Sequence, residues 1–125
     1  MKKFLFLFVG LFIALNMLAE DRYGINILNE ISYQQAQNYP KQWEISTYKY
    51  TNPYGQTSTR YFIFAPSIKH NSTIVLIRAK QPGCPWQVRI DGRSYYADFR
   101  SSNDLKVGDE GVLKYDGDRL YMCVD

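Results

Sequence analysis

The side chains that usually carry catalysis are scarce in this chain of 125 residues. It has one histidine, His70, and two cysteines, Cys84 and Cys123. His70 lies in a polar stretch between two apolar runs, where we expect a solvated loop residue rather than a general base. Two thiols and one distant histidine do not make a zinc site. We therefore predict no enzyme activity, no metal and no cofactor, and the alternative is a small hydrolase that gathers His70 with two carboxylates.

The chain also lacks a cluster of lysine and arginine. It has 15 basic and 12 acidic residues, and two of the basic ones, Lys2 and Lys3, precede a long apolar run. Loss of that segment would lower the 15 basic residues to 13 against the same 12 acidic ones. A protein that binds nucleic acid needs a basic face to neutralise phosphates. The composition therefore predicts no nucleic-acid partner.

The longest apolar run stands at the start of the chain. Lys2 and Lys3 are followed by apolar residues 4–14, and the chain turns polar at Glu20. This pattern is typical of a signal peptide, here residues 1–19, and predicts a periplasmic or secreted protein. Met17 is a poor residue three positions before the cut, and residues 4–19 are almost long enough to cross a bilayer. The alternative is therefore an uncleaved anchor, which would be the protein's only contact with a membrane.

Export changes the meaning of the two cysteines. In an oxidising compartment, a pair of cysteines in a small protein usually forms a disulfide. A bridge between Cys84 and Cys123 would close a loop of about 40 residues and contribute roughly 4 kcal/mol in the chain-entropy model. We therefore expect a Cys84–Cys123 disulfide.

Residues 20–40 are predicted to form an N-terminal helix or linker. Between positions 24 and 39, apolar residues recur at helical spacing, and Pro40 ends the pattern. The alternative is an irregular strand, which would also suit Ile25, Ile27, Ile31 and Tyr33. After Pro40 the pattern changes, so residues 41–125 are predicted as a separate β-barrel domain.

Short apolar runs and turn signals alternate through residues 41–125, as is typical of an antiparallel β fold. Strands are predicted within residues 43–51, 60–65, 73–79 and 86–99. The last range contains Asp91-Gly92, a favoured two-residue hairpin turn, which places Ile90 opposite Arg93. Six or seven short strands predict a mainly β protein, a small OB-like or SH3-like antiparallel barrel or sandwich with one N-terminal helix.

A second hairpin is predicted at Asp116-Gly117. A two-residue turn there would place Leu113 opposite Leu120, and also Lys114 opposite Arg119. The second pair brings two like charges together, which is unfavourable. A three-residue loop is therefore the alternative.

The C-terminal segment from Leu105 to Leu113 reads LKVGDEGVL and is followed by Asp116-Gly117 and Leu120-Tyr121. It resembles the closing strands of small bacterial envelope barrels, such as the OB-like soluble domain of the NfeD membrane-protein family. In those domains a GD-x-G step begins a strand that carries an apolar pair into a final hairpin. The resemblance implies an OB-like or SH3-like barrel at a membrane or in the periplasm, and it transfers no catalytic residue.

Tyrosine is abundant, with 11 residues. Exposed tyrosines make good contact surfaces for proteins or sugars, although strands also favour them for structural reasons. The first candidates for a binding surface are Tyr48, Tyr50 and Tyr54, and the second is the proline-stiffened 82–85 loop with Trp86. We therefore expect a non-enzymatic binding or accessory protein of the bacterial envelope with a protein partner. The alternative is an inhibitor or immunity-type protein with a rigid protruding loop.

Overall fold

The computed structural model describes residues 21–65 and 67–125, so the expected signal peptide lies outside the described residues. The protein is mainly β, with 57% of the described residues in strands. These residues also include two short helical segments, α2 (Tyr33–Gln37) and the 3-10 turn η1 (Gln42–Glu44). None of the described helices is long and apolar enough to span a membrane. The strands are β1 (Asp21–Ile31), β2 (Ser46–Thr51), β3 (Thr57–Phe64), β4 (Ser72–Arg78), β5 (Trp86–Ile90), β6 (Arg93–Phe99), β7 (Glu110–Asp116) and β8 (Arg119–Val124).

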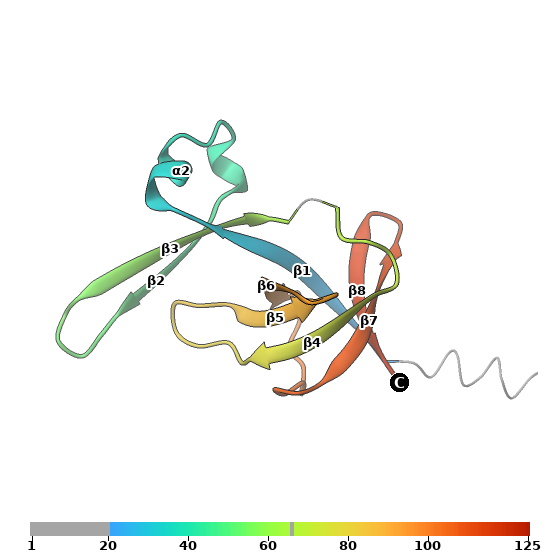
Figure 1. Cartoon of the computed structure of the whole chain (residues 1–125). Coiled ribbons are helices and arrows are strands. Elements are labelled where there is room, and N and C mark those ends of the chain that lie inside the picture. The colour runs from blue at the N-terminus through green and yellow to red at the C-terminus, as the bar shows by residue number, and fades with distance from the viewer. Residues whose placement is uncertain (1–20, 66) are drawn as a thin grey trace, which may run out of the picture.

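Six of these strands close into an antiparallel barrel, in the order β1-β6-β5-β4-β7-β8 (Figure 1). The barrel closes where the first half of β1 pairs with β8, from Asp21 opposite Val124 to Gly24 opposite Tyr121. Because the barrel is closed, each of these six strands has a neighbouring strand on both sides. The predicted mainly β class and barrel architecture are confirmed.

The helix predicted over residues 24–39 is wrong, because most of that segment is strand β1. Ile25 and Ile27 alternate into the barrel, where they are 0% and 4% exposed. The helical segment that follows covers only Tyr33–Gln37, and a capping box between Ser32 and Gln35 begins it. β1 has strand neighbours along both of its edges, and these long-range pairings override the local helical spacing. The segment is therefore a wall of the barrel rather than a helix or linker outside it.

The second half of β1 leaves the barrel and supports a hairpin, which we call the arm. The arm consists of β2, β3 and the turn of residues 52–56, and β3 pairs with β1 from Leu28 opposite Phe64 to Ile31 opposite Tyr61. Figure 1 shows the arm projecting beside the barrel, with α2 near its base. Because Asp21 pairs with Val124, both ends of the described chain lie at the opposite end of β1 from the arm.

Of the two predicted hairpins, the first has the predicted register and the second does not. The β5–β6 hairpin is confirmed: Ile90 pairs with Arg93, and both turn residues have positive φ, 48° at Asp91 and 84° at Gly92. This is the backbone of a type I′ turn.

The predicted register of the β7–β8 hairpin is wrong. Leu113 pairs with Met122, so the two-residue loop is Gly117-Asp118 rather than Asp116-Gly117. Gly117 has a φ of 68° and takes the first central position, where a type II′ turn requires glycine. This register also places Asp116 opposite Arg119. Opposite charges therefore replace the like-charge pair that the predicted register would have created.

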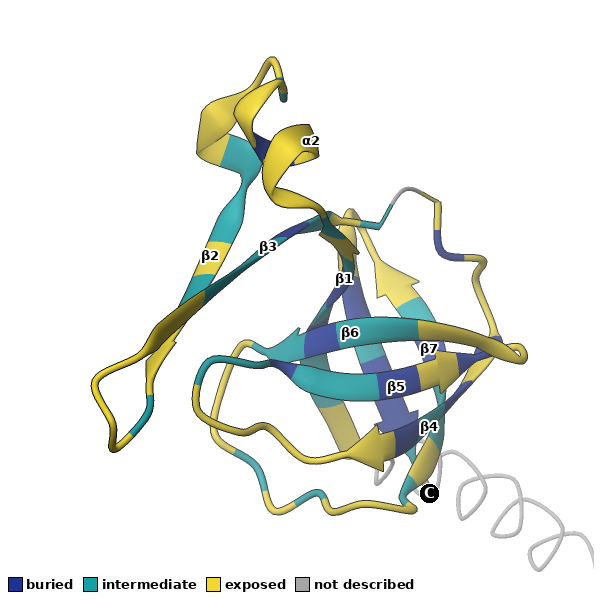
Figure 2. Cartoon of the chain, turned by 60° about the vertical axis from the view of Figure 1, so that its left-hand side comes forward, coloured by how far each residue is buried: buried dark blue, intermediate teal, exposed yellow. Residues whose placement is uncertain are grey.

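The hydrophobic core fills the barrel. Its fully buried side chains come from all parts of the closed sheet and include Ile25, Ile74, Leu76, Val88, Leu113 and Met122. Figure 2 shows buried residues running along the barrel strands, whereas β2 and the outer half of β3 are mostly exposed or intermediate. The arm is therefore held by a few contacts on the outside of the barrel and not by this core.

Candidate functional site

A cleft of about 590 Å³ lies between the arm and the outer face of the barrel. The arm contributes Tyr50, Ser58 and Arg60 to one wall, and residues 81–84, in the connection between β4 and β5, contribute the other. The remaining lining side chains, Arg78, Gln87 and Tyr96, belong to β4, β5 and β6. The volume is within the range of pockets that hold small molecules or short peptide segments.

The floor of this cleft is one row of side chains across three neighbouring strands. Arg78 of β4 pairs with Gln87 of β5, and Gln87 pairs with Tyr96 of β6. Val88, next to Gln87, is fully buried in the barrel, so alternation places Gln87 on the outer face. All three side chains of the row carry hydrogen-bonding groups.

A β-bulge brings Arg78 into this row. Leu76 pairs with Val88 and points into the core, so regular alternation would also turn Arg78 inward. Between Leu76 and Arg78 the register shifts by one residue, and Ile77 is the extra one. The shift returns Arg78 to the outer face beside Gln87. Bulges are over-represented next to functional sites, because they re-aim a side chain in this way.

Phe62 fastens the arm to the barrel. Its side chain is fully buried, and its ring meets Tyr48 of β2 at 5.2 Å and Tyr96 of β6 at 5.1 Å between centroids, both in tilted or edge-to-face geometry. Such aromatic pairs contribute about 0.5–1.5 kcal/mol each beyond the area they bury. One arm residue and one floor residue are thus joined through Phe62.

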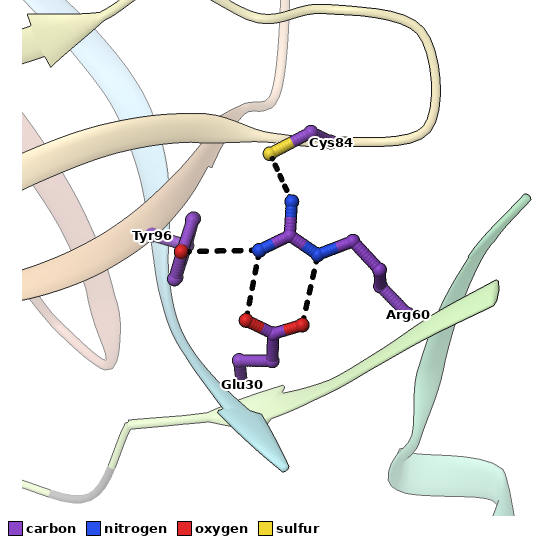
Figure 3. Close-up of polar contacts among 4 residues, drawn as sticks. All are labelled: Glu30, Arg60, Cys84 and Tyr96. Atoms are coloured by element: carbon purple, nitrogen blue, oxygen red, sulfur yellow. Dashed lines mark hydrogen bonds and ion pairs between the residues drawn. The ribbon is translucent and has the colours of Figure 1, made fainter. Parts of the chain in front are cut away.

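Arg60 makes the second connection between the arm and the barrel (Figure 3). Its Nε and Nη2 donate to the two carboxylate oxygens of Glu30, both at 2.8 Å. Nη2 also donates to the Tyr96 hydroxyl at 3.1 Å, and Nη1 donates to the Cys84 sulfur at 2.9 Å. Four of the five N–H groups of the guanidinium are therefore used.

This ion pair changes the protonation behaviour of both partners. Hydrogen bonding to Arg60 lowers the pKa of Glu30 below its ordinary value of 4.5. The hydrogen bond to Glu30 in turn raises the pKa of Arg60. The two side chains are 35% and 33% exposed, so the pair is partly screened by solvent. Within the cleft, the charge of Arg60 is thus already balanced by Glu30.

Arg78 has no such balance. No ion pair or side-chain hydrogen bond of Arg78 occurs within residues 21–65 and 67–125, and none of the ten residues that line the cleft is acidic. Its side chain is exposed to the cleft. The cleft therefore has a positive charge at one end of its floor.

Gly83 lets the 81–84 loop touch the arm. Gly83 has a φ of 76°, and a Cβ atom there would lie 2.5 Å from Cβ of Tyr50. Only glycine fits both the backbone conformation and this close approach. The loop is therefore packed against β2 and does not project freely into solvent.

The structure brings together some of the predicted surface residues and separates others. Tyr50 and the 82–84 part of the proline-stiffened loop line the same cleft. Tyr48 supports the arm through Phe62, and Tyr54 is 89% exposed at the tip of the arm. Trp86 does not line this cleft.

Trp86 lines a separate cavity of about 530 Å³ with Lys80, Asp98 and Phe99. Burial raises the pKa of Asp98, whose Oδ1 atom has no hydrogen-bond partner in the described part of the chain and lies 4.0 Å from Lys80 Nζ. Lys80 is 60% exposed, and it can reach this oxygen by a small movement. Lys80 can therefore satisfy Asp98 without a ligand in this cavity.

The expected disulfide is not formed. Cys84 precedes β5 and contacts Arg60, whereas Cys123 is buried on β8, and the two cysteines are not near each other. In the barrel order, β4 and β7 lie between β5 and β8. The expectation was wrong because sequence spacing does not show which strands are neighbours.

His70 lies away from the cleft. Its Nδ1 accepts a hydrogen bond from the backbone N–H of Tyr115 at 3.2 Å, and its ring stacks on that tyrosine. Within the described residues, no group of three histidine, cysteine or acidic side chains is placed to hold a metal ion.

The residues that sequence reasoning missed are Glu30, Arg60, Arg78 and Phe62. One signal was available in the sequence. Arg60 and Phe62 lie on the same face of a predicted strand, so burial of Phe62 would also partly bury the charge of Arg60. A partly buried arginine needs an acidic or hydrogen-bonding partner. Neither the partner Glu30 nor the bulge at Ile77 could be located without the pairing of distant strands.

Comparisons with family models, curated proteins and solved structures found no match to this chain. The resemblance of the C-terminal segment to the NfeD soluble domain therefore stays a prediction.

Proposed function

We propose that this protein is a non-enzymatic binding or accessory protein that holds a segment of a partner protein in the cleft between the arm and the barrel. One observation supports the proposal most strongly. The two surfaces selected from the sequence, the tyrosine-bearing strand and the proline-stiffened loop, meet where Gly83 packs against Tyr50, and together they line one cleft.

The chemistry of the cleft favours binding over hydrolysis. The cleft is lined by hydrogen-bonding groups and by the tyrosine rings of Tyr50 and Tyr96. The Cys84 sulfur is hydrogen-bonded by Arg60, and the histidine that a hydrolase would use as a base contacts Tyr115 on a different part of the barrel. A hydrolase needs its base within reach of its nucleophile. The arrangement therefore supports a site that recognises rather than cleaves.

The tip of the arm supports a second candidate, an inhibitor or immunity-type protein. Asn52 Oδ1 accepts from the backbone N–H groups of Tyr54 and Gln56, both at 2.9 Å, and its amide donates to the Gln56 side chain. These bonds hold a turn that presents Tyr54 with 89% of its surface exposed. An exposed aromatic side chain on a hydrogen-bonded turn suits insertion into the cleft of an enzyme.

We propose the bacterial envelope as the location, on the basis of the leader-like residues 1–19. The arm lies at the far end of β1 from Asp21. The described chain therefore enters the barrel at Asp21, at the end of β1 away from the cleft.

Affinity capture from the native envelope tests the binding function, provided that it includes two matched variants. Ser58→Trp fills the cleft from the arm, whereas Thr47→Trp adds the same side chain to the opposite, outward face of the arm. The proposal expects a protein that wild type and Thr47→Trp capture and that Ser58→Trp does not. Capture that is unchanged by Ser58→Trp, or no capture at all, would contradict it. Loss with Tyr54→Ala alone would support the inhibitor.

A further inference from the structure

We propose that the cleft recognises a carboxylate, and that its occupant is an extended peptide segment with an acidic side chain. This inference rests on the proposed binding function and names the chemistry of the partner. Its central residue is Arg78, with Gln87 and Tyr96 beside it on the floor of the cleft.

The charges of the cleft leave one position open to an anion. Arg60 is matched by Glu30 through two hydrogen bonds of 2.8 Å, so it attracts little further negative charge. Arg78 faces the same cleft with no acidic partner in the described part of the chain, and no acidic residue lines the cleft. A guanidinium binds carboxylates in a planar, two-pronged geometry. The carboxylate therefore belongs at Arg78.

The rest of the floor suits the main chain of a peptide. Neighbouring strands are about 4.8 Å apart, so the row from Arg78 to Tyr96 spans about 10 Å, roughly the length of three extended residues. Gln87 offers both a donor and an acceptor. The Tyr96 hydroxyl accepts from Arg60, which leaves its own proton for donation to a ligand. A peptide that anchors an acidic side chain at Arg78 thus meets further polar groups along the row.

The walls suit the side chains of such a peptide. Tyr50 and Pro82 present apolar surface, and Ser58 and Gln81 present hydrogen-bonding groups. The β-bulge at Ile77 turns Arg78 out of the barrel and into this cleft. Ion pairing at an exposed site weakens as salt rises. Binding is therefore expected to be sensitive to ionic strength.

The test uses an array of eight-residue peptides with both ends blocked, so that side chains are the only carboxylates. The best peptide is then compared in solution with its Glu→Gln and Asp→Asn counterpart by fluorescence anisotropy. The protein variants are Arg78→Gln, which removes the proposed contact, and Arg89→Gln. Arg89 lies on the same outer face of β5, pairs with Val75 and Ser94, and does not line the cleft, so its loss is a matched change of charge.

The inference expects that acidic peptides are selected and that Arg78→Gln and the neutral counterpart each lower affinity about threefold or more, as is usual for an exposed ion pair. Arg89→Gln is expected to lower affinity less than twofold at physiological salt. Arg78→Gln and Arg89→Gln both change exposed side chains, so both variants are expected to fold. Thermal melts of the two variants are the check.

The other outcomes separate this inference from the proposed function. Peptides that bind wild type and not Ser58→Trp, with no preference for acidic residues and no effect of Arg78→Gln, would overturn the carboxylate and leave the binding function standing. A third outcome is that no peptide binds, whereas an acidic oligosaccharide such as oligogalacturonate binds wild type and not Arg78→Gln. That result would support recognition of a carboxylate and overturn the peptide as its source. If wild type binds no ligand whose binding Ser58→Trp abolishes, both the carboxylate inference and the proposed binding function are overturned.

Discussion

Truncation of Phe62 to alanine is expected to loosen the packing of the arm against the barrel. The Phe62 side chain is fully buried between Tyr48 of the arm and Tyr96 of the barrel. Removal of the ring loses the transfer free energy of the buried atoms and leaves a cavity between two layers. Because the cleft depends on the position of the arm, the same change is also expected to weaken binding in it.

The cost can be worked out from the contacts. Replacement of a buried phenylalanine by alanine destabilises a protein by about 3–5 kcal/mol. The arm is exposed on its other side and can relax into the gap, so we expect the lower end, about 3 kcal/mol. The free energy of unfolding of such a domain is only about 5–15 kcal/mol. At about 4–8 °C per kcal/mol, the melting temperature should fall by roughly 12–24 °C.

Urea denaturation followed by circular dichroism measures this loss. Phe64→Ala is the matched control, because Phe64 lies two residues along the same strand and is 58% exposed. Its loss should cost only about 0.5 kcal/mol. Equal destabilisation by the two substitutions would refute the role assigned to Phe62.

Three further predictions concern the same region. Gly83→Ala should destabilise the protein by about 1–3 kcal/mol more than Gly55→Ala, because both positions have positive φ but only Gly83 would clash, with Tyr50; equal melting temperatures would contradict the close contact. Glu30→Gln should cost about 0.5–1 kcal/mol at pH 7. Because the pKa of Glu30 is lowered in the folded state, this contribution is present above pH 4.5 and is lost as the pH falls through the folded pKa; urea titrations of both proteins at pH 7 and pH 3 check it, and a constant difference would exclude the ion pair as its source. Alkylation of the unfolded protein without reductant should add two groups by intact mass, one at Cys84 and one at Cys123; a mass without adducts would show that the two are bridged after all.

Local patterns predicted those parts of the fold that depend on neighbouring residues. Trp86, Val88 and Ile90 alternate with polar residues up to Asp91-Gly92, and the observed register follows that alternation. At the last hairpin, the same reasoning placed the loop one residue too early. Gly117 can occupy either central position of a two-residue turn. The pairing of Leu113 with Met122 and of Asp116 with Arg119 decided between the two positions.

Long-range pairing overruled the local pattern in β1. Ile25, Ile27 and Ile31 suit both helical spacing and alternation, so the pattern alone could not choose between helix and strand. β8 and β6 border this segment in the barrel, and their backbone groups pair with it. A helix would leave those strands with unpaired edges. The same dependence on strand order explains why the disulfide expectation failed.

The candidate site shows the same division. The residue types that make good contact surfaces, Tyr50 and the proline-stiffened loop, could be selected because their chemistry is visible in any context. The arginines could not, since their roles depend on which charges face them: Glu30 is 30 positions from Arg60 in the chain and 2.8 Å away in space. Arg78 gained its place through a bulge, which is a property of two paired strands.

The amino-acid order alone determined that this is a small β-rich chain with short strands, tight turns and an excess of tyrosine, because turn chemistry and alternation act over a few residues. Only the closed sheet decided that β1 completes the barrel, that the β2–β3 hairpin stands outside it, and that Arg60 is balanced while Arg78 is not. These features follow from contacts between segments far apart in the chain, where strand order and register bring hydrogen-bonding edges and charges together.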